Sequence, residues 1–263
     1  MNIIEVNDLV KKFGDFEAVK HASFSVAQGE IFAFLGPNGA GKTTSIRILT
    51  TMLKRTGGEV LVDGKDPAKD ADGVRRSCGI VFQDPSLDDE LTAWENMEFH
   101  GVLFGVPKKI RRERIEQLLN TVELWDRKDD FVKNFSGGMK RRLEIARGIL
   151  HHPKILFLDE PTLGLDPQTR NHIWGYIKSL NEKEGITVFF TTHYMDEAER
   201  MSGRIAIIDH GLIIIQGTAR ELKEKTGTNS LEEAFLSLTG ETIREESVGS
   251  TDRMRLSKKW RRH

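Results

Sequence analysis

The segment Gly36-Pro-Asn-Gly-Ala-Gly-Lys-Thr-Thr44 decides the fold of this 263-residue chain. It satisfies the pattern G-x-x-x-x-G-K-[ST], and it stands between an apolar run at 31–35 and a segment with helical spacing at 43–53. The glycines let successive backbone N–H groups face one anion, and the helix start adds a favourable dipole. Lys42 is expected to reach the β- and γ-phosphates of a nucleotide, and the Thr43 hydroxyl to bind Mg²⁺. We therefore predict that a nucleotide is held by a phosphate loop made of Gly36, Pro37, Asn38, Gly39, Ala40, Gly41, Lys42, Thr43 and Thr44.

Two adjacent carboxylates end another apolar run, Ile155-Leu-Phe-Leu-Asp-Glu-Pro161. In parallel sheets ligands bind outside the carboxyl ends of the strands, where Asp159 and Glu160 would lie. Asp159 is expected to complete the Mg²⁺ shell through water, and Glu160 to accept a proton from the attacking water or to orient it. Taken alone, the two acids are equally consistent with a strand closing into a turn before Pro161. The phosphate loop favours the catalytic interpretation.

A second glycine pair, in Asn134-Phe-Ser-Gly-Gly-Met-Lys-Arg-Arg142, opens another helix. Ser136 is a favourable N-cap, and apolar residues follow at helical spacing from Leu143. Gly137 and Gly138 would let backbone N–H groups approach an anion closely. An ordinary capped helix is the alternative for an isolated Ser-Gly-Gly.

Short apolar runs alternate with helical stretches along the chain. The runs 31–35, 79–82, 155–158, 187–190 and 205–208 are typical of strands buried on both faces, and helices are expected at 43–53 and 168–184. This alternation predicts an α/β fold with a mostly parallel sheet. Residues 90–150 lack such runs and are expected to form an inserted helical subdomain, with a helical pattern at 108–124. Period-two alternation at Phe24/Val26 and Val60/Val62 predicts a small antiparallel sheet.

The end of the chain has signals of its own. Asp209-His-Gly211 before the run 213–215 predicts a hairpin, and Thr218-x-x-Glu221 and Ser230-x-x-Glu233 predict two capped helices. We expect a main domain over 1–217, a helical extension over 218–246 and a flexible basic tail over 247–263. The tail holds six Lys/Arg and one acid, a net charge of +5, so the remaining residues sum to −6. Two interpretations stay open for it: attraction to an anionic membrane surface with Trp260 as an anchor, or a solvated end.

Composition narrows the class of protein. Lys plus Arg number 39 against 40 Asp plus Glu, so no overall field favours nucleic acid, and none is expected as a partner. The single Cys78 excludes an internal disulfide framework and fits a reducing compartment. The apolar runs are too short to span a bilayer, and the N-terminus lacks the apolar core of a signal peptide. These features predict a soluble, cytosolic protein.

Six motifs follow one another along the chain: the phosphate loop, GIVFQDP, FSGGM, LFLDEP, GLDP and TTH. Through these motifs and their order, the chain resembles the ATP-binding subunit of an ABC (ATP-binding cassette) transporter over residues 3–217. The resemblance implies that Ser136, Gly137 and Gly138 close on the γ-phosphate of ATP bound by a partner protomer. It also implies that Asp166 lies at the dimer interface, that Gln83 contacts Mg²⁺ or the attacking water, and that His193 contacts the γ-phosphate. Phe13 in KKFG occupies the place of the aromatic that stacks on adenine; the alternative is that Phe13 is a core residue of the small sheet and Phe16 stacks instead.

Met139 stands where many members of this family have glutamine. The chain also resembles a narrower, drug-resistance group of the daunorubicin-efflux kind, through the segments SGGM, KRRLEIARGIL, THYMDEAER and LEEAFLSLTG. The ATPase subunits of that group work with separate membrane proteins. This resemblance implies an ATPase that dimerises around ATP and Mg²⁺, at the cytoplasmic face of the membrane, and drives a permease that exports a drug-like or lipophilic compound. The transported compound, the direction of transport and the identity of the second ATPase subunit, a copy or a homologue, stay open.

The helical subdomain and the loop around Gln83 are the expected docking face for the permease. Exposed rings at Trp94, Phe99 and Phe104 are expected to contribute; the alternative is that they form the core of the subdomain. Two other classes of function remain: an ABC-type ATPase that acts on DNA or the ribosome, and an ATP-binding scaffold without hydrolysis. A single cassette without a heptad run argues against the first, and intact Glu160 and His193 argue against the second.

Overall fold

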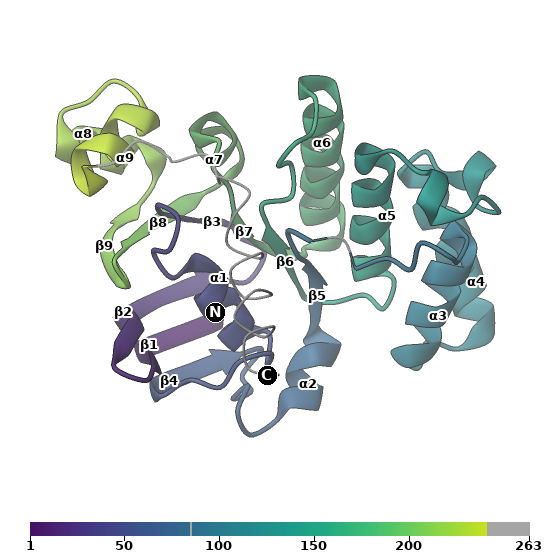
Figure 1. The fold of residues 1–263 in the computed structure, drawn as a ribbon, viewed down its shortest axis with the longest axis horizontal. Helices are drawn as coiled ribbons and strands as arrows, with labels where there is room; N and C mark the ends of the chain where they lie inside the picture. Colours follow the sequence, from purple (N-terminus) through teal and green to yellow (C-terminus); the bar gives the residue numbers. More distant parts are fainter. Residues whose placement is uncertain (85, 241–263) are drawn as a thin grey trace, which may run out of the picture.

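The computed structural model describes residues 1–84 and 86–240, and its centre is a six-stranded sheet with strand order β5-β6-β7-β3-β8-β9 (Figure 1). Neighbouring strands from β5 to β8 run parallel, and β9 is antiparallel to β8. The bounds are β3 Ile31–Leu35, β5 Cys78–Val81, β6 Ile155–Asp159, β7 Thr187–Thr191, β8 Arg204–Asp209 and β9 Leu212–Gly217. Each predicted apolar run is a strand of this sheet, because residues covered on both faces must be apolar throughout.

A second, three-stranded antiparallel sheet lies beside the first, with order β2-β1-β4. Its strands are β1 Asn2–Phe13, β2 Phe16–Ala27 and β4 Gly57–Val62. The predicted alternation is confirmed, since Phe24, Val26, Val60 and Val62 are all buried. A shared core holds the two sheets together, with α1 (Lys42–Leu49) contributing Ile46 and Leu49.

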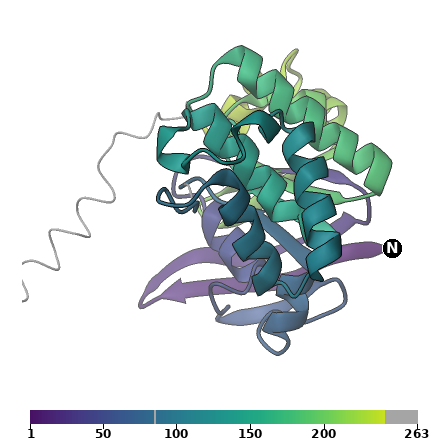
Figure 2. The same cartoon turned by 90° about the vertical axis from the view of Figure 1, so that its right-hand side faces the viewer.

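The expected inserted helices occupy one end of the molecule (Figure 1), and Figure 2 looks directly onto them. They are α3 Ala93–Leu103, α4 Lys108–Thr121, the short 3₁₀ turns η1 Trp125–Arg127 and η2 Val132–Asn134, and α5 Gly137–Ile149. They have a core of their own, in which Met97, Ile115 and Leu143 are fully buried. The α/β class with a small antiparallel sheet and an inserted helical part is therefore confirmed, while the exact domain boundaries stay predictions.

The remaining helices cover the sheet and its last hairpin: α2 Ala71–Ser77, α6 Pro167–Glu184, α7 Met195–Met201, α8 Ala219–Thr226 and α9 Leu231–Thr239. The predicted β8–β9 hairpin is present, and its turn residues His210 and Gly211 both have positive φ, as a tight two-residue turn requires. The 168–184 helix is confirmed. The 43–53 helix ends early, at Leu49, because Thr51 adopts φ 68° and leaves the helical region.

Three smaller expectations need correction. Thr218 and Glu221 form a complete capping box, but the Glu233 carboxylate accepts from the Asn229 N–H (3.0 Å) and not from that of Ser230, so only half of the second box forms. Trp94 and Phe104 are half-buried and not exposed: Trp94 meets Trp125 edge-on and Phe104 stacks on His151, with ring centroids 6.2 and 3.9 Å apart. Phe99 is 66% exposed, as expected.

Residues 241–246 of the expected extension and the basic tail 247–263, with Trp260, lie outside the described residues. Within the part of the chain that the structure describes, no helix is both long enough and apolar enough to cross a bilayer.

The aromatic cluster between the two sheets should dominate stability. Phe189 is fully buried, with ring centroids 5.5 Å from each of Phe32, Phe34 and Phe157. Phe189→Ala should lower the free energy of unfolding by about 3–5 kcal/mol because it leaves a cavity among rings that cannot collapse into it. Phe99→Ala, at an exposed ring, should change it by less than about 0.5 kcal/mol. Urea unfolding of both variants measures this, and equal small losses would contradict the assigned core.

Candidate active site

The carboxyl ends of the central parallel strands bring the predicted motifs together at one edge of the sheet (Figure 1). β3 leads into the phosphate loop, β6 ends at Asp159 and β7 ends at Thr191. The parallel register pairs Asp159 directly with Thr191, and β7 also pairs with β3. Because successive loops leave the sheet at the same edge, residues that are far apart in sequence meet there.

The phosphate loop needs its glycines for two different reasons. Gly39 and Gly41 have φ of 81° and 112°, a region that residues with a Cβ rarely adopt. A Cβ at Gly36 would lie 2.1 Å from the Ile208 carbonyl oxygen, and one at Gly41 would lie 2.7 Å from that of Ala18. The Lys42 ammonium donates to the carbonyls of Gly36 (2.7 Å) and Pro37 (3.1 Å), so the loop curves around its own cation.

An open cavity of about 330 Å³ contains most of the predicted nucleotide site. Its lining residues are Phe13, Phe16, Ala18, Asn38, Gly39, Gly41, Lys42, Thr43, Thr44, Gln83 and Glu160. Phe13 and Phe16 face each other across the tip of the β1–β2 hairpin and are 50% and 65% exposed. The alternative that Phe13 belongs to the core of the small sheet is therefore wrong, and both rings are available at the cavity.

Asp159 is held toward the phosphate loop from two sides. Its carboxylate accepts from the Thr43 hydroxyl (3.1 Å) and from the Thr191 hydroxyl (2.6 Å). Burial raises the pKa of Asp159 above its ordinary value, and the two hydroxyls, together with Lys42, oppose that shift. Without compensating charge an ionised carboxylate is unfavourable in such a place, which is a reason for a cation to be bound there.

Glu160 follows Asp159 with an unusual backbone and a close partner. Its φ is 51°, in the left-handed region, and its side chain is largely buried. The His193 Nε2 atom lies 2.6 Å from Glu160 Oε1. Glu160 Oε2 and His193 Nδ1 are both buried without a hydrogen-bond partner among the described residues. Glu160, the expected base, and His193, the residue expected to contact the γ-phosphate, thus meet at the edge of the cavity.

The other predicted residues form a separate group. Ser136 caps α5 by accepting from the Met139 N–H (3.3 Å), and Asp166 caps α6 by accepting from the N–H (3.0 Å) and hydroxyl (2.6 Å) of Thr169. These bonds lower the pKa of the exposed Asp166 carboxyl. A Cβ on Gly138 would lie 2.9 Å from Thr169 Cγ2, so the two helix starts lie side by side. Ser136, Gly137 and Gly138 do not line the cavity that holds the phosphate loop.

Sequence reasoning missed two buried charged residues behind the site. Glu197 of α7 accepts from the hydroxyls of Thr162 (2.8 Å) and Thr192 (3.0 Å), and so ties the segment before Asp166 to the residue before His193. Arg141 of α5 donates to the backbone on either side of Glu160. The sequence offered one weak signal for Arg141, an acid three residues further on at Glu144, but Arg141 stands between two other basic residues, Lys140 and Arg142.

The donor set at this edge fits MgATP. Mg²⁺ prefers oxygen ligands and keeps several waters, and Thr43, Gln83 and Asp159 supply oxygen atoms while leaving room for phosphates and water. Among the described residues, no group of three or more His, Cys, Asp or Glu side chains is arranged to hold a metal ion.

Comparison with known proteins agrees with this geometry. The family model described as ABC transporter matches residues 19–163, and an AAA-domain model matches residues 132–195. The chain is 44% identical to the daunorubicin/doxorubicin resistance ATP-binding protein DrrA of Streptomyces peucetius, over 87% of this chain and 69% of that protein. It is 40% identical to the linearmycin resistance ATP-binding protein LnrL of Bacillus subtilis, over 87% and 73% of the respective chains.

Solved structures show the same fold. An ATP-binding subunit of an ABC transporter superposes with a TM-score of 0.83 at 28% identity, covering 90% of this chain and 99% of that one. The cassette MJ0796, solved as a dimer in a post-hydrolysis state with ADP and Pi, superposes with a TM-score of 0.74 at 31% identity, covering 82% and 98%. With a family model over more than half its length, the chain belongs to the ABC transporter family, as one of its ATP-binding, ATP-hydrolysing subunits.

Proposed function

We propose that two cassettes enclose two MgATP molecules, each bound by the phosphate loop of one protomer and the Ser136–Gly138 segment of the other. One observation carries this proposal: Ser136, Gly137 and Gly138 start a helix beside Asp166, but they do not line their own chain's cavity. Their backbone N–H groups are suited to an anion that their own chain does not bring to them. The dimeric state of the similar cassette MJ0796 with ADP and Pi bound supports the pairing of two cassettes.

Hydrolysis is proposed to proceed at Glu160. The Glu160 carboxylate accepts a proton from a water molecule as that oxygen attacks the γ-phosphorus, and the bond to the β-phosphate oxygen breaks to give ADP and phosphate. His193 holds the Glu160 carboxylate in place at 2.6 Å and contacts the γ-phosphate when ATP is bound. Lys42 neutralises charge on the phosphates. Its ammonium group lies inside the phosphate loop, where it donates to the carbonyls of Gly36 and Pro37.

Thr43, Gln83 and Asp159 are the proposed holders of Mg²⁺, which would neutralise the charge that builds up between the β- and γ-phosphates. Thr43 would hold the ion through its hydroxyl, and Asp159 would hold it through water. The Thr43–Asp159 hydrogen bond of 3.1 Å already places the two groups on one side of the cavity.

The proposed transport role rests on the relatives and on the surface of α3. The names of DrrA and LnrL refer to resistance to daunorubicin/doxorubicin and to linearmycin, which supports export of a drug-like or lipophilic compound through a separate permease. Phe99, Val102 and Leu103 are exposed, and an open cavity of about 690 Å³ beside them is lined by Asp72, Arg75, Arg76, Leu103, Phe104 and Gly105. We assign this surface to the permease, which would hold the cassette at the cytoplasmic face of the membrane.

Glu160→Gln should leave ATP binding intact and slow hydrolysis by about 10²-fold or more, because the amide cannot accept the proton from water. The same variant should accumulate as an ATP-bound dimer. Steady-state turnover, nucleotide binding and size-exclusion chromatography measure the three effects, with Glu182→Gln as a control at an exposed carboxylate of α6. Undiminished turnover in Glu160→Gln would refute the assigned role.

Phe13→Ala should weaken ATP binding by about 1–3 kcal/mol, the usual contribution of a ring stacked on a base. Phe16→Ala should have the smaller effect if Phe13 is the stacking residue. Isothermal titration with MgADP compares both with Phe99→Ala, which removes an exposed ring on α3, away from the cavity. A larger loss in Phe16→Ala would transfer the assignment to Phe16, and no loss in either would remove the hairpin tip from the site.

Purified from native membranes, the chain should carry a polytopic membrane protein with it. Phe99→Asp combined with Leu103→Asp should release that protein, because charged groups replace apolar contacts, while the ATP turnover of the isolated chain stays within about twofold. Mass spectrometry of the co-purified material identifies the partner. Recovery of ribosomes or DNA in place of a membrane protein would favour the alternative class of ABC-type ATPase.

A further inference from the structure

Arg141 of α5 forms a dense set of hydrogen bonds beside the site. It is only 7% exposed, and its five N–H donors each have an acceptor. Nε donates to the Pro161 carbonyl (2.7 Å), and Nη2 to the carbonyls of Asp159 (3.0 Å) and Glu160 (2.7 Å). Nη1 donates to the Phe82 carbonyl and to the Glu144 carboxylate (3.3 Å). No rotation of the guanidinium preserves this set, so its position is fixed.

These bonds fall on the strained part of the backbone. Three consecutive carbonyls, those of residues 159–161, turn toward one cation while Glu160 between them has φ 51°. A non-glycine residue in the left-handed region costs free energy and persists only where its surroundings hold it. On the other side, the Glu160 N–H donates to the Thr191 carbonyl (3.2 Å). Arg141 therefore holds the peptide that directs the Glu160 side chain.

Arg141 and Glu144 also hold the loop that carries Gln83, at both of its ends. The carbonyl oxygen of Phe82, which precedes Gln83, accepts a hydrogen bond from Arg141 Nη1. Ser86, after it, donates its backbone N–H to the Glu144 carboxylate at 2.7 Å and its hydroxyl at 3.2 Å. Arg147 adds a bond to the Ser86 carbonyl (2.8 Å). Two residues one turn apart on α5 thus reach the backbone on both sides of Gln83.

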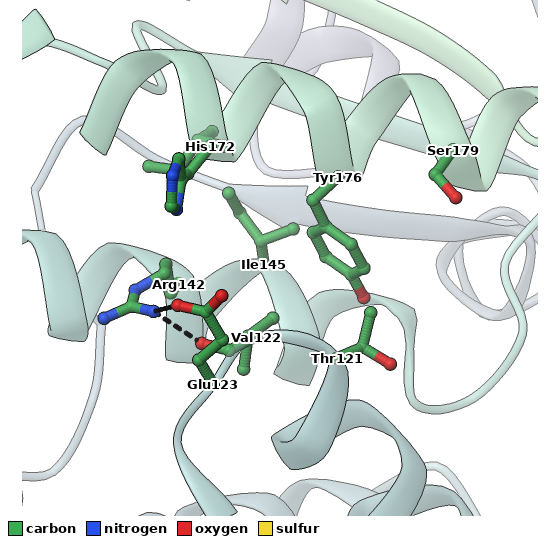
Figure 3. Close-up of a pocket in the computed structure, with 9 residues that line it drawn as sticks. Thr121, Val122, Glu123, Arg142, Ile145, His172, Tyr176 and Ser179 are labelled. Atoms are coloured by element: carbon green, nitrogen blue, oxygen red, sulfur yellow. Dashed lines mark hydrogen bonds and ion pairs between the residues drawn. The ribbon is translucent and has the colours of Figure 1, made fainter. Parts of the chain in front are cut away.

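The neighbouring arginine does something different. Arg142 points away from the strand ends, toward the turn after α4, where it donates to the Val122 carbonyl (2.8 Å) and the Glu123 carboxylate (3.1 Å) (Figure 3). Its partners lie within the inserted helices, beside a cavity shared by α4, α5 and α6. Arg142 thus offers a matched comparison: the same side chain on the same helix, one residue away, without a contact to Glu160 or to the loop around Gln83.

We propose that the buried Arg141–Glu144 pair of α5 is a positioning unit that sets Glu160 and Gln83 relative to each other. The proposal rests on the proposed roles of Glu160 in hydrolysis and Gln83 at Mg²⁺. Because α5 begins with Ser136–Gly138, the helix that would meet the partner's γ-phosphate is the same helix that holds these two residues. A shift of α5 on closing would therefore move the base and the glutamine together.

The pair is suited to this task because neither member can be removed without consequence. The Glu144 side chain is 1% exposed, and a guanidinium stays charged in a protein even though burial lowers the pKa of Arg141. Loss of either partner leaves the other charge buried and uncompensated. A lysine at 141 keeps the charge but presents a single nitrogen, which cannot reach acceptors on three separate segments.

Arg141→Lys and Arg142→Lys test the proposal as a pair, in the full-length chain. Arg141→Lys should lower kcat for ATP by about tenfold or more, since misplacement of reacting groups by about 1 Å costs up to 10²-fold, while the affinity for MgADP stays within about twofold. Arg142→Lys should stay within about twofold in both quantities. Equal kcat losses in the two variants, or a loss of affinity that accounts for the drop in kcat/KM, would overturn the proposal.

Glu144→Gln provides a second route that keeps the side chain's size. Its amide can serve either Ser86 or Arg141 but not both, so kcat should fall and the Ser86 amide should exchange faster with solvent in hydrogen-exchange measurements. The double variant with Arg141→Lys should lose no more than the worse single variant, because the two residues act as one unit. Additive losses, or an unchanged kcat together with unchanged exchange at Ser86, would contradict the unit.

Glu160→Gln, measured in parallel, distinguishes a failure of the proposed catalytic role of Glu160 from a failure of the proposed positioning unit. If that variant keeps full turnover, the proposed catalytic role of Glu160 fails. If it is inactive but Arg141→Lys folds and turns over normally, the positioning unit alone fails. Should Arg141→Lys not fold, the kcat and exchange measurements on Glu144→Gln decide the matter.

Discussion

The parallel register between β6 and β7 is the constraint on which the site depends. It sets Asp159 opposite Thr191, and the Thr191 hydroxyl then holds the Asp159 carboxylate at 2.6 Å. β3 lies on the other side of β7, so the phosphate loop that follows it begins at the same edge, and Thr43 reaches Asp159. A one-residue slip of β6 would turn Asp159 to the opposite face of the sheet and separate the proposed metal ligands.

At this edge of the sheet, positively charged side chains lie close to negatively charged ones. Lys42 and Arg141 approach the carboxyl end of β6 from different elements, and Asp159, Glu160 and Glu144 balance them. The backbone contributes as much as the side chains: Lys42 binds two carbonyls of its own loop, and Arg141 binds three consecutive carbonyls around the strained Glu160. Such groups are fixed before any nucleotide arrives, which is the condition for electrostatic stabilisation of a developing charge.

Local chemistry explains what could be predicted from the sequence. The phosphate loop, the strand that ends in Asp159 and the Ser136 cap are contiguous segments in which each residue type has one physical purpose, and the structure contains each of them. The residues whose roles could not be predicted from the sequence depend on tertiary contacts. Arg141 looked like one of three adjacent basic residues, and only the packing of α5 on the strand ends shows that it is buried while Arg142 faces the turn after α4.

The same reasoning explains the errors. For Trp94 and Phe104 the sequence leaves both a surface and a core position open, because nothing in their neighbourhood identifies Trp125 and His151 as their partners. Conversely, Phe13 could have been part of the core of the small sheet, but the tight hairpin leaves it at the tip beside Phe16. The helix after the phosphate loop ends early, at Leu49, because Thr51 adopts a left-handed backbone conformation that helical spacing cannot reveal.

A composite site made by two chains is the central claim of this account, and complementation between two inactive chains tests it most directly. One chain carries Lys42→Ala and the other Ser136→Arg, so each alone lacks one half of every site. In a mixed dimer the wild-type phosphate loop of one chain meets the wild-type Ser136–Gly138 segment of the other, which gives one intact site. Random pairing should therefore restore up to about a quarter of wild-type turnover. If the mixture stays as inactive as its components, the two halves of the site belong to the same chain and the account is wrong.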